Sequence, residues 1–173
     1  ALTTDGVQAL TTDQVQALTS IQLRGLSATN LQALETRDIQ ALTTTQVSQL
    51  STANLSYFTT DQVQALKTDQ VQALTSIQLR GLSATNLQAL ETRDIQALTT
   101  TQISQLSTVN LSNLTTNQVT ALTTDQVQAL TAFQLRGFSA TNQQALETRD
   151  IQALTTTQLS QLSTSNMFNM SVI

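Results

Sequence analysis

The sequence repeats every eight residues from end to end, with no insertion or deletion. Starting at Leu2 and stepping by eight, every position is apolar and nearly all are Leu; we name these positions the Leu column. The Val column starts at Val7 and is apolar at every position except Gln143. The amide column starts at Gly6 and holds Gln, Asn or Asp at every later position. A period this strict predicts a small unit that stacks on itself, because a single octad cannot bury a core alone.

The sequence also has a longer repeat, which is seven octads in length. Residues 18–57 and 74–113 differ at three positions only: Val47/Ile103, Ala53/Val109 and Tyr57/Asn113. We therefore expect a single repeat array over residues 1–173 with about 21 octads. Its long repeats lie near residues 18–73, 74–129 and 130–173.

Each octad carries the signals of a helix start. Thr11 is a candidate N-cap and Gln14 follows three residues later, which is the spacing of a capping box. Leu10 and Val15 occupy the two positions of a hydrophobic staple around that cap. Thr3 and every eighth residue after it form the cap column, in which all but four members are Ser or Thr. The exceptions in that column are Glu35, Lys67, Glu91 and Glu147.

Two folds compete for such a repeat. Helices of about two turns are too short to be stable alone, so the helical interpretation predicts an all-α solenoid of short Thr-capped helices around a continuous core. The alternative is a β-solenoid, since Thr and Val favour strands and an amide column is able to form a ladder. Tight β-coils usually place Gly or Pro at their corners. The chain has four Gly and no Pro, so we favour the all-α solenoid.

The composition excludes several functional classes. The chain contains no His and no Cys, so imidazole bases, thiol nucleophiles and His- or Cys-ligated metals are ruled out. We expect no enzyme activity, no catalytic or metal-binding residues and no cofactor. The net charge is −4, the wrong sign for a phosphate-binding surface, so we expect no nucleic-acid partner. No apolar run approaches the length of about 20 residues that spans a membrane.

The charged residues follow the long repeat and are the main candidates for a binding site. One Arg per long repeat precedes a Gly, and a Glu-Thr-Arg-Asp sequence follows further along the same repeat. The candidate partner-binding residues are Arg24, Glu35, Arg37, Asp38, Arg80, Glu91, Arg93, Asp94, Arg136, Glu147, Arg149 and Asp150. The alternative is that these residues solvate a neutral surface or pair along the solenoid wall, where exposed pairs contribute little.

A large apolar residue recurs once per long repeat in a column that is usually polar. These residues are Ile21, Ile77 and Phe133. Either they thicken the core together with Leu23 and Leu26, or they form a patch for lateral association.

Two resemblances concern the octad itself. LTTDQVQAL at residues 10–18 resembles the LTTxQVxAL-type tandem repeats of large exported bacterial exoproteins related to adhesion and haem utilisation. That resemblance covers the whole chain and implies an extracellular or surface-attached bacterial scaffold. LTTDQVQALTS and QALET also resemble the two helices of a TAL-effector repeat. The second resemblance supports Thr-capped helices only, because those repeats are much longer than an octad and contain a base-reading loop that this chain lacks.

The sequence therefore predicts a structural repeat scaffold or spacer. Its expected partners are other copies of itself or neighbouring repeats of a larger chain, with a surface protein or polysaccharide as a further candidate. One alternative is a binding module with one Arg/Glu-Asp site per long repeat. A second alternative is a β-solenoid whose Thr face binds ice or polysaccharide.

Overall fold

A computed structural model describes residues 3–170, and all the regular structure in that range is helical. Each octad forms one short α-helix of five to seven residues. The prediction of an all-α solenoid is confirmed, and the β-solenoid alternative is wrong, together with the Thr-lined β face on which ice binding depended. Local capping explains why the octads are helical. The Thr and Gln of a capping box accept hydrogen bonds from backbone N–H groups that are otherwise unpaired at a helix start.

The chain divides into two compact units, Ala1–Leu90 and Glu91–Ile173, and each is described by itself. The helices of unit 1 are α1 (Thr4–Gln8), α2 (Thr12–Ala17), α3 (Ser20–Arg24), α4 (Ala28–Ala33), α5 (Thr36–Ala41), α6 (Thr44–Gln49), α7 (Thr52–Ser56), α8 (Thr60–Gln64), α9 (Thr68–Ala73), α10 (Ser76–Arg80) and α11 (Ala84–Ala89). The helices of unit 2 are α12 (Thr92–Ala97), α13 (Thr100–Ser104), α14 (Thr108–Ser112), α15 (Thr116–Thr120), α16 (Thr124–Ala129), α17 (Ala132–Arg136), α18 (Ala140–Gln144), α19 (Thr148–Gln152), α20 (Thr156–Gln161) and α21 (Thr164–Met170).

The helices begin where the cap column predicts. Thr11 is the N-cap of α2, and its Oγ1 accepts a hydrogen bond from the Gln14 N–H at 3.3 Å. Gln14 Oε1 in turn accepts the Thr11 N–H at 2.9 Å, which completes the capping box. The helix ends at Leu18, whose extended φ and ψ of −62° and 131° turn the chain into the next cap. Because each octad begins and ends a helix in this way, the chain changes direction about once every eight residues.

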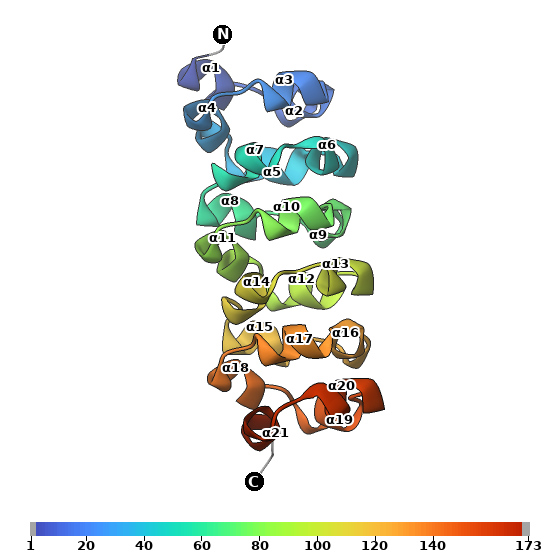
Figure 1. Cartoon of the computed structure of the whole chain (residues 1–173). Helices are drawn as coiled ribbons and strands as arrows, with labels where there is room; N and C mark the ends of the chain where they lie inside the picture. The colour runs from blue at the N-terminus through green and yellow to red at the C-terminus, as the bar shows by residue number, and fades with distance from the viewer. Residues whose placement is uncertain (1–2, 171–173) are drawn as a thin grey trace. The chain divides into compact units, whose positions relative to one another are not determined.

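Successive turns of the chain stack on one another within each unit. In unit 1, α1 packs on α4, α2 on α5, and α8 on α11; in unit 2, α13 packs on α16 and α18 on α21. Figure 1 shows α1, α4, α8 and α11 along the same side of unit 1, in steps of three, four and three helices. A turn of the superhelix therefore takes about three and a half octads. The long repeat of the sequence, at seven octads, corresponds to two such turns.

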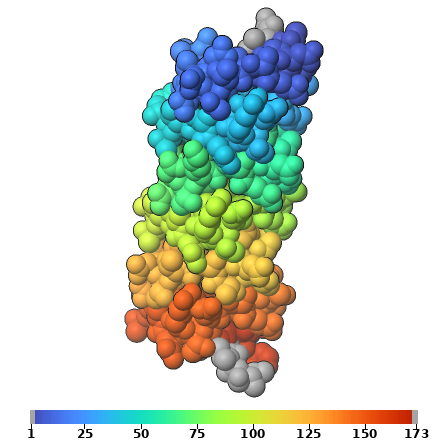
Figure 2. Space-filling model, turned by 180° about the vertical axis from the view of Figure 1, so that it is seen from behind, coloured from blue at the N-terminus to red at the C-terminus, as the bar shows by residue number. Residues whose placement is uncertain are grey.

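The core lies between the turns and consists of the two apolar columns. Val47, Val71 and Leu79 of the Val column are fully buried, and Leu50 and Leu74 of the Leu column are 4% and 2% exposed. The space-filling view shows the turns of each unit packed directly on one another (Figure 2). Burying these side chains supplies most of the stability, because such short helices gain little from backbone hydrogen bonds alone.

The amide column also lies between the turns. Gln78 is 3% exposed, and its Nε2 donates to the carbonyl oxygens of Val47 at 2.9 Å and Leu50 at 2.7 Å, in the helix four before its own. Its Oε1 accepts the Thr75 N–H at 2.7 Å. Side chains that donate in the same way to a helix four earlier include Gln46, Asn54, Gln62, Gln70 and Asn86 in unit 1, and Gln126, Gln134, Asn142 and Gln158 in unit 2. A Gln such as Gln78 therefore caps the start of its own helix and the end of a helix in the preceding turn.

Candidate functional site

The Glu-Thr-Arg-Asp sequences form compact charged triplets at helix starts. In unit 1, Arg37 Nε lies 2.9 Å from Glu35 Oε2 and 3.7 Å from Asp38 Oδ1. The Asp38 carboxylate also accepts the Glu35 N–H at 3.0 Å and is fully buried, whereas Arg37 and Glu35 are about half exposed. The cap residue and the two residues of the first turn therefore form one local ion-paired group.

The same geometry recurs in unit 2. Arg93 Nε lies 2.9 Å from Glu91 Oε2 and 3.7 Å from Asp94 Oδ1. Arg149 Nε lies 3.0 Å from Glu147 Oε2 and 3.6 Å from Asp150 Oδ1. Each guanidinium group is flanked by two carboxylates of its own helix start, so an external anion would compete with both of them. The triplets therefore have the geometry of local pairs, which is the second of the two interpretations offered by the sequence.

Asp at the amide column changes the chemistry of the link between turns. A carboxylate cannot donate a hydrogen bond to the carbonyl groups of the preceding turn, as Gln and Asn do. Asp150 instead accepts a hydrogen bond from Thr124 Oγ1 at 3.2 Å, across to α16. The neighbouring Arg149 offsets the buried negative charge. Asp150 therefore acts as a hydrogen-bond acceptor at a column position where Gln or Asn acts as a donor in other turns.

The three Arg residues that precede glycines form a separate group. Arg24, Arg80 and Arg136 lie in the last turns of α3, α10 and α17. Arg136 Nη1 donates to the Gln161 carbonyl at 2.8 Å, and its guanidinium lies 5.9 Å from the centre of the Phe133 ring. Another residue of the same column makes the equivalent bond, as Gln128 Nε2 donates to the Ala153 carbonyl at 2.9 Å. Arg136 thus belongs to a second, outer set of hydrogen bonds between turns.

The ion pairs of the three triplets are therefore local. Within residues 3–170, Arg37, Arg93 and Arg149 each pair with the two carboxylates of their own helix start. Partner binding by these residues stays a prediction.

The Gly residues that follow Arg80 and Arg136 lie close to a Thr of the preceding turn. Gly81 has an ordinary right-handed conformation, with φ −82° and ψ −7°. A Cβ atom added there would lie 2.9 Å from Cγ2 of Thr52, in the preceding turn. At Gly137 the equivalent contact with Thr108 would be 2.6 Å. Gly25 has no such neighbour, because its added Cβ would meet only carbonyl oxygens of its own helix.

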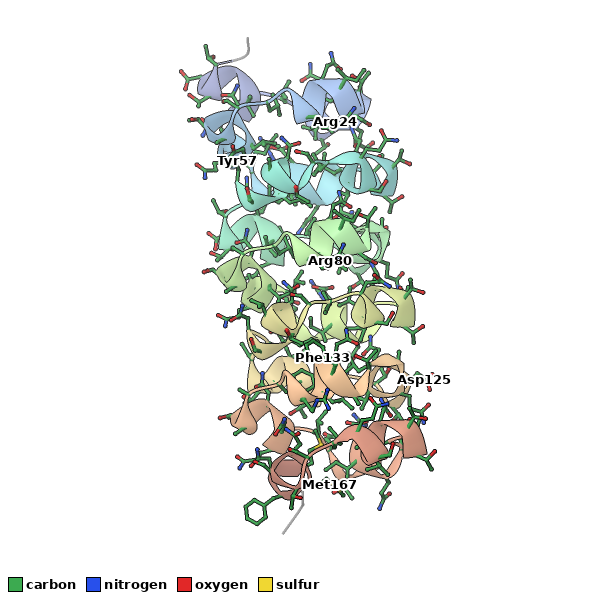
Figure 3. The ribbon with its side chains drawn as sticks, in the orientation of Figure 1. Arg24, Tyr57, Arg80, Asp125, Phe133 and Met167 are labelled. Atoms are coloured by element: carbon green, nitrogen blue, oxygen red, sulfur yellow. The ribbon has the colours of Figure 1, made fainter. Side chains whose placement is uncertain are left out.

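The apolar residues of the usually polar column are exposed. Ile21, Ile77 and Phe133 have 76%, 64% and 64% of their surface accessible, so the expectation that they thicken the core is wrong. The second position of a helix points away from the neighbouring turns, which explains the exposure. In the side-chain view Arg24 and Arg80 lie on one side of unit 1, and Phe133 is on the surface of unit 2 (Figure 3). Lateral association through these residues stays a prediction.

The surface carries shallow, open grooves. One open groove in unit 1 is lined by Thr52, Ser56, Ile77, Arg80 and Gly81, among others. No cluster of three or more acidic side chains with the spacing of a metal site occurs within residues 3–170. None of the helices described is long and apolar enough to cross a membrane.

Sequence reasoning missed the hydrogen bonds of the amide column to the preceding turn. A signal for them is present, since a capping box accepts Glu as readily as Gln. The column nevertheless contains no Glu at any of its positions. Outside the three triplets, where Asp38, Asp94 and Asp150 occupy the column, every position after Gly6 is Gln or Asn. At those positions the absence of Glu indicates that the amide donor is needed, in addition to the oxygen that caps the helix.

Helices of one repeated octad, stacked turn on turn with a shared core and shared hydrogen bonds, define an all-α repeat solenoid. Three matches to the ALTTAQ repeat family cover residues 20–52, 48–76 and 76–108. Together these matches span just over half of the chain, which belongs to the ALTTAQ repeat family. No curated protein matches the sequence.

Proposed function

We propose that the chain is a non-enzymatic scaffold or spacer, acting outside a bacterial cell or at its surface in a larger or self-assembling structure. The observation that carries the proposal is the repetition of one interface. Gln46, Gln78 and Gln158 make the same two bonds to the preceding turn, and none of these turns carries a distinct constellation of reactive groups. A repeat of this kind sets a distance and an orientation, because every octad adds a similar increment.

The location outside the cell is supported by the resemblance of the octads to the repeats of exported bacterial exoproteins. Protease treatment of intact cells that produce the protein tests it. We expect the chain to be degraded or recovered in the medium, and protection until the cells are lysed would contradict the location.

The scaffold proposal is tested by shortening the array in and out of register. Deleting residues 74–129 removes two turns and joins Ala73 to Leu130, so every column continues across the junction. We expect the same helical circular dichroism per residue, one cooperative melting transition and a smaller radius of gyration in solution scattering. Deleting residues 74–101 is the matched control, because that segment is three and a half octads long and its removal shifts the columns at the junction. Equal loss of structure in both variants would contradict a modular spacer.

A further inference from the structure

A groove between α7 and α10 brings an apolar side chain, a guanidinium group and hydroxyl groups together on the surface of unit 1. The two helices pack on each other, and the groove has a volume of about 520 Å³, which is in the range of small-ligand sites. Of the residues that line it, only Arg80 is charged. The groove is therefore cationic, although the whole chain carries a net charge of −4. The lining residues are Thr52, Ala53, Ser56, Ile77, Arg80 and Gly81.

Gly81 lies where the two helices come closest. A Cβ atom added there would lie 2.9 Å from Cγ2 and 3.1 Å from Cβ of Thr52. Because Gly81 has no side chain, α7 lies against the end of α10. The neighbouring Arg80 and the hydroxyl groups of α7 consequently line the same groove.

Ser56 supplies a hydrogen-bond acceptor to this groove. Its Oγ donates to the Ala53 carbonyl at 2.8 Å, so the hydroxyl proton is held by the backbone of α7. A hydroxyl group has one donor and two acceptor positions, so the oxygen is still able to accept a hydrogen bond from a ligand. The side chain is exposed, and its orientation is set before any ligand arrives.

Unit 2 carries the corresponding residues on α14 and α17, which pack on each other. Gly137 is approached by Thr108, as the glycine of unit 1 is approached by its threonine. Ser112 Oγ donates to the Val109 carbonyl at 2.9 Å, so this serine also has a fixed orientation. Phe133 takes the place of the isoleucine. The arrangement therefore occurs once in each unit.

The guanidinium group in unit 2 is held by two contacts that leave its charge in place. Arg136 Nη1 donates to the Gln161 carbonyl at 2.8 Å, and the guanidinium carbon lies 5.9 Å from the centre of the Phe133 ring. The remaining N–H groups suit a carboxylate, which accepts two parallel hydrogen bonds from one guanidinium. A cation held in this way loses less conformational entropy when it binds an anion. The triplet Arg residues differ, because each of them already pairs with two carboxylates.

We propose that these two grooves bind the sugar-acid units of an anionic polysaccharide. A sugar acid combines a carboxylate, hydroxyl groups and an apolar C–H face. Arg80 or Arg136 binds the carboxylate, and the serine oxygen of the preceding helix accepts a hydrogen bond from a sugar hydroxyl. Ile77 or Phe133 packs against the C–H face. Both side chains are 64% exposed, and covering their apolar surface adds to the affinity.

The serine acceptors favour a polysaccharide over an acidic polypeptide. An Asp or Glu side chain brings a carboxylate without a neighbouring hydroxyl group, so it would leave Ser56 and Ser112 unused. A polymer of sugar acids also presents the same group at every unit, so a chain with two grooves gains from the high effective concentration of further units after the first has bound. The proposal goes beyond the scaffold function, since a spacer needs no ligand.

Isothermal titration calorimetry of the whole chain with polygalacturonate and with alginate, two polymers of sugar acids, tests the proposal. Dextran is the neutral polysaccharide for comparison, and polyglutamate is the acidic polypeptide. We expect saturable binding of at least one sugar-acid polymer, no binding of dextran, and binding of polyglutamate that is about tenfold weaker or more. The proposal would be overturned if neither sugar-acid polymer bound, or if polyglutamate bound equally well, which would make an acidic polypeptide the ligand.

Variants with matched charge locate the site. Arg80→Gln/Arg136→Gln should raise the dissociation constant by about tenfold or more, because both grooves lose the partner of the carboxylate. Arg24→Gln/Lys67→Gln is the control, since it removes the same charge from exposed residues outside the two grooves and should change the affinity little. Arg80→Lys/Arg136→Lys keeps the charge without the planar fork and should recover only part of the affinity. Equal losses in the Gln variants and their control would show attraction to net charge alone.

The serine acceptors are tested separately from the charge. Ser56→Ala/Ser112→Ala should weaken the binding of the sugar-acid polymer by about threefold or more and leave any binding of polyglutamate unchanged. An unchanged affinity for the sugar-acid polymer would overturn the assignment of a sugar ligand. Circular dichroism and melting should match those of the unmodified chain, because both serines are exposed and Ala is a good helix former. This control separates a loss of binding from a loss of fold.

Discussion

Residues 18–27 and 74–83 have the same amino acids, LTSIQLRGLS, and occupy two different environments in unit 1. Both segments form a short helix with the same capping box, α3 and α10. Gln22 is exposed whereas Gln78 is 3% exposed, and Leu26 is half-buried whereas Leu82 is 7% exposed. The octad therefore determines its own helix locally, and the preceding turn determines whether its side chains form a core.

This comparison separates two kinds of stabilisation. Capping is local and is present in the first turn as in the later ones. Burial and the amide bonds to carbonyl groups need a neighbouring turn, as in other linear repeat proteins. Substitutions at matched positions of the two segments should therefore differ in effect by the contribution of that neighbouring turn.

The largest difference is expected for a charge in the Leu column. Leu82→Asp places a carboxylate between two turns with no partner, so we expect a loss of more than about 3 kcal/mol in the free energy of unfolding. Cooperative thermal melting, followed by circular dichroism, should be lost or strongly broadened. Leu26→Asp is the matched control, and its half-exposed carboxylate should be tolerated much better. Equal melting of the two variants would mean that the Leu column is not a core.

The part of this fold that the sequence predicts is the part that depends on local chemistry. Thr11 and Gln14 define a helix start by themselves, so the cap positions, the helix class and the two apolar columns follow from the octad. The number of octads per turn does not follow, because it depends on how the Leu and Val columns of different turns fit together. The environment of Ile77 also depends on packing between turns, so the sequence does not decide between core and surface; the structure places it at the surface.

The candidate charged site shows the same division. The proximity of Glu35 to Arg37 is local, and the sequence predicts pairing along the wall as one of its two interpretations. The contacts of Arg136 with the Gln161 carbonyl and of Asp150 with Thr124 join residues more than three octads apart. No spacing within an octad or a long repeat encodes those contacts directly, because they arise from the pitch of the superhelix.

A smaller difference is expected for the amide column. Gln78→Glu keeps the acceptor for the Thr75 N–H but places a carboxylate against the Val47 and Leu50 carbonyls. Losing two hydrogen bonds and adding repulsion should lower the free energy of unfolding by about 2 to 3 kcal/mol. Urea denaturation measures the loss, with Gln22→Glu as the control, since the Gln22 side chain is exposed. A similar loss in both variants would show that the donor has no role between turns.

The smallest difference is expected at the glycines, where only one of the two segments should lose stability. Replacing a glycine in right-handed conformation with Ala stabilises a protein by up to about 1 kcal/mol when space allows, because the unfolded chain loses freedom. A Cβ at Gly25 would meet no neighbouring turn, only the Ile21 and Gln22 carbonyl oxygens of its own helix at 3.3 and 3.5 Å, so Gly25→Ala should melt at about the same temperature as the unmodified chain or slightly higher. Gly81→Ala should melt lower, because its methyl group would lie 2.9 Å from Cγ2 of Thr52 and overpacking costs about 1 kcal/mol or more.

The cause of the effect at Gly81 is isolated by a second substitution in the preceding turn. Thr52→Ser removes Cγ2, so Gly81→Ala/Thr52→Ser should recover part of the stability lost in Gly81→Ala, and a double-mutant cycle in urea gives the coupling free energy. Gly137→Ala extends the series, since its 2.6 Å contacts include Cβ of Thr108 and predict a larger loss that a Ser cannot relieve. If the three Ala variants melt alike, the spacing between turns is loose enough to absorb a methyl group. If the melting temperature instead falls in the order Gly25→Ala, Gly81→Ala, Gly137→Ala, the close approach of the preceding turn, and not the direction of the helix, requires glycine at this column.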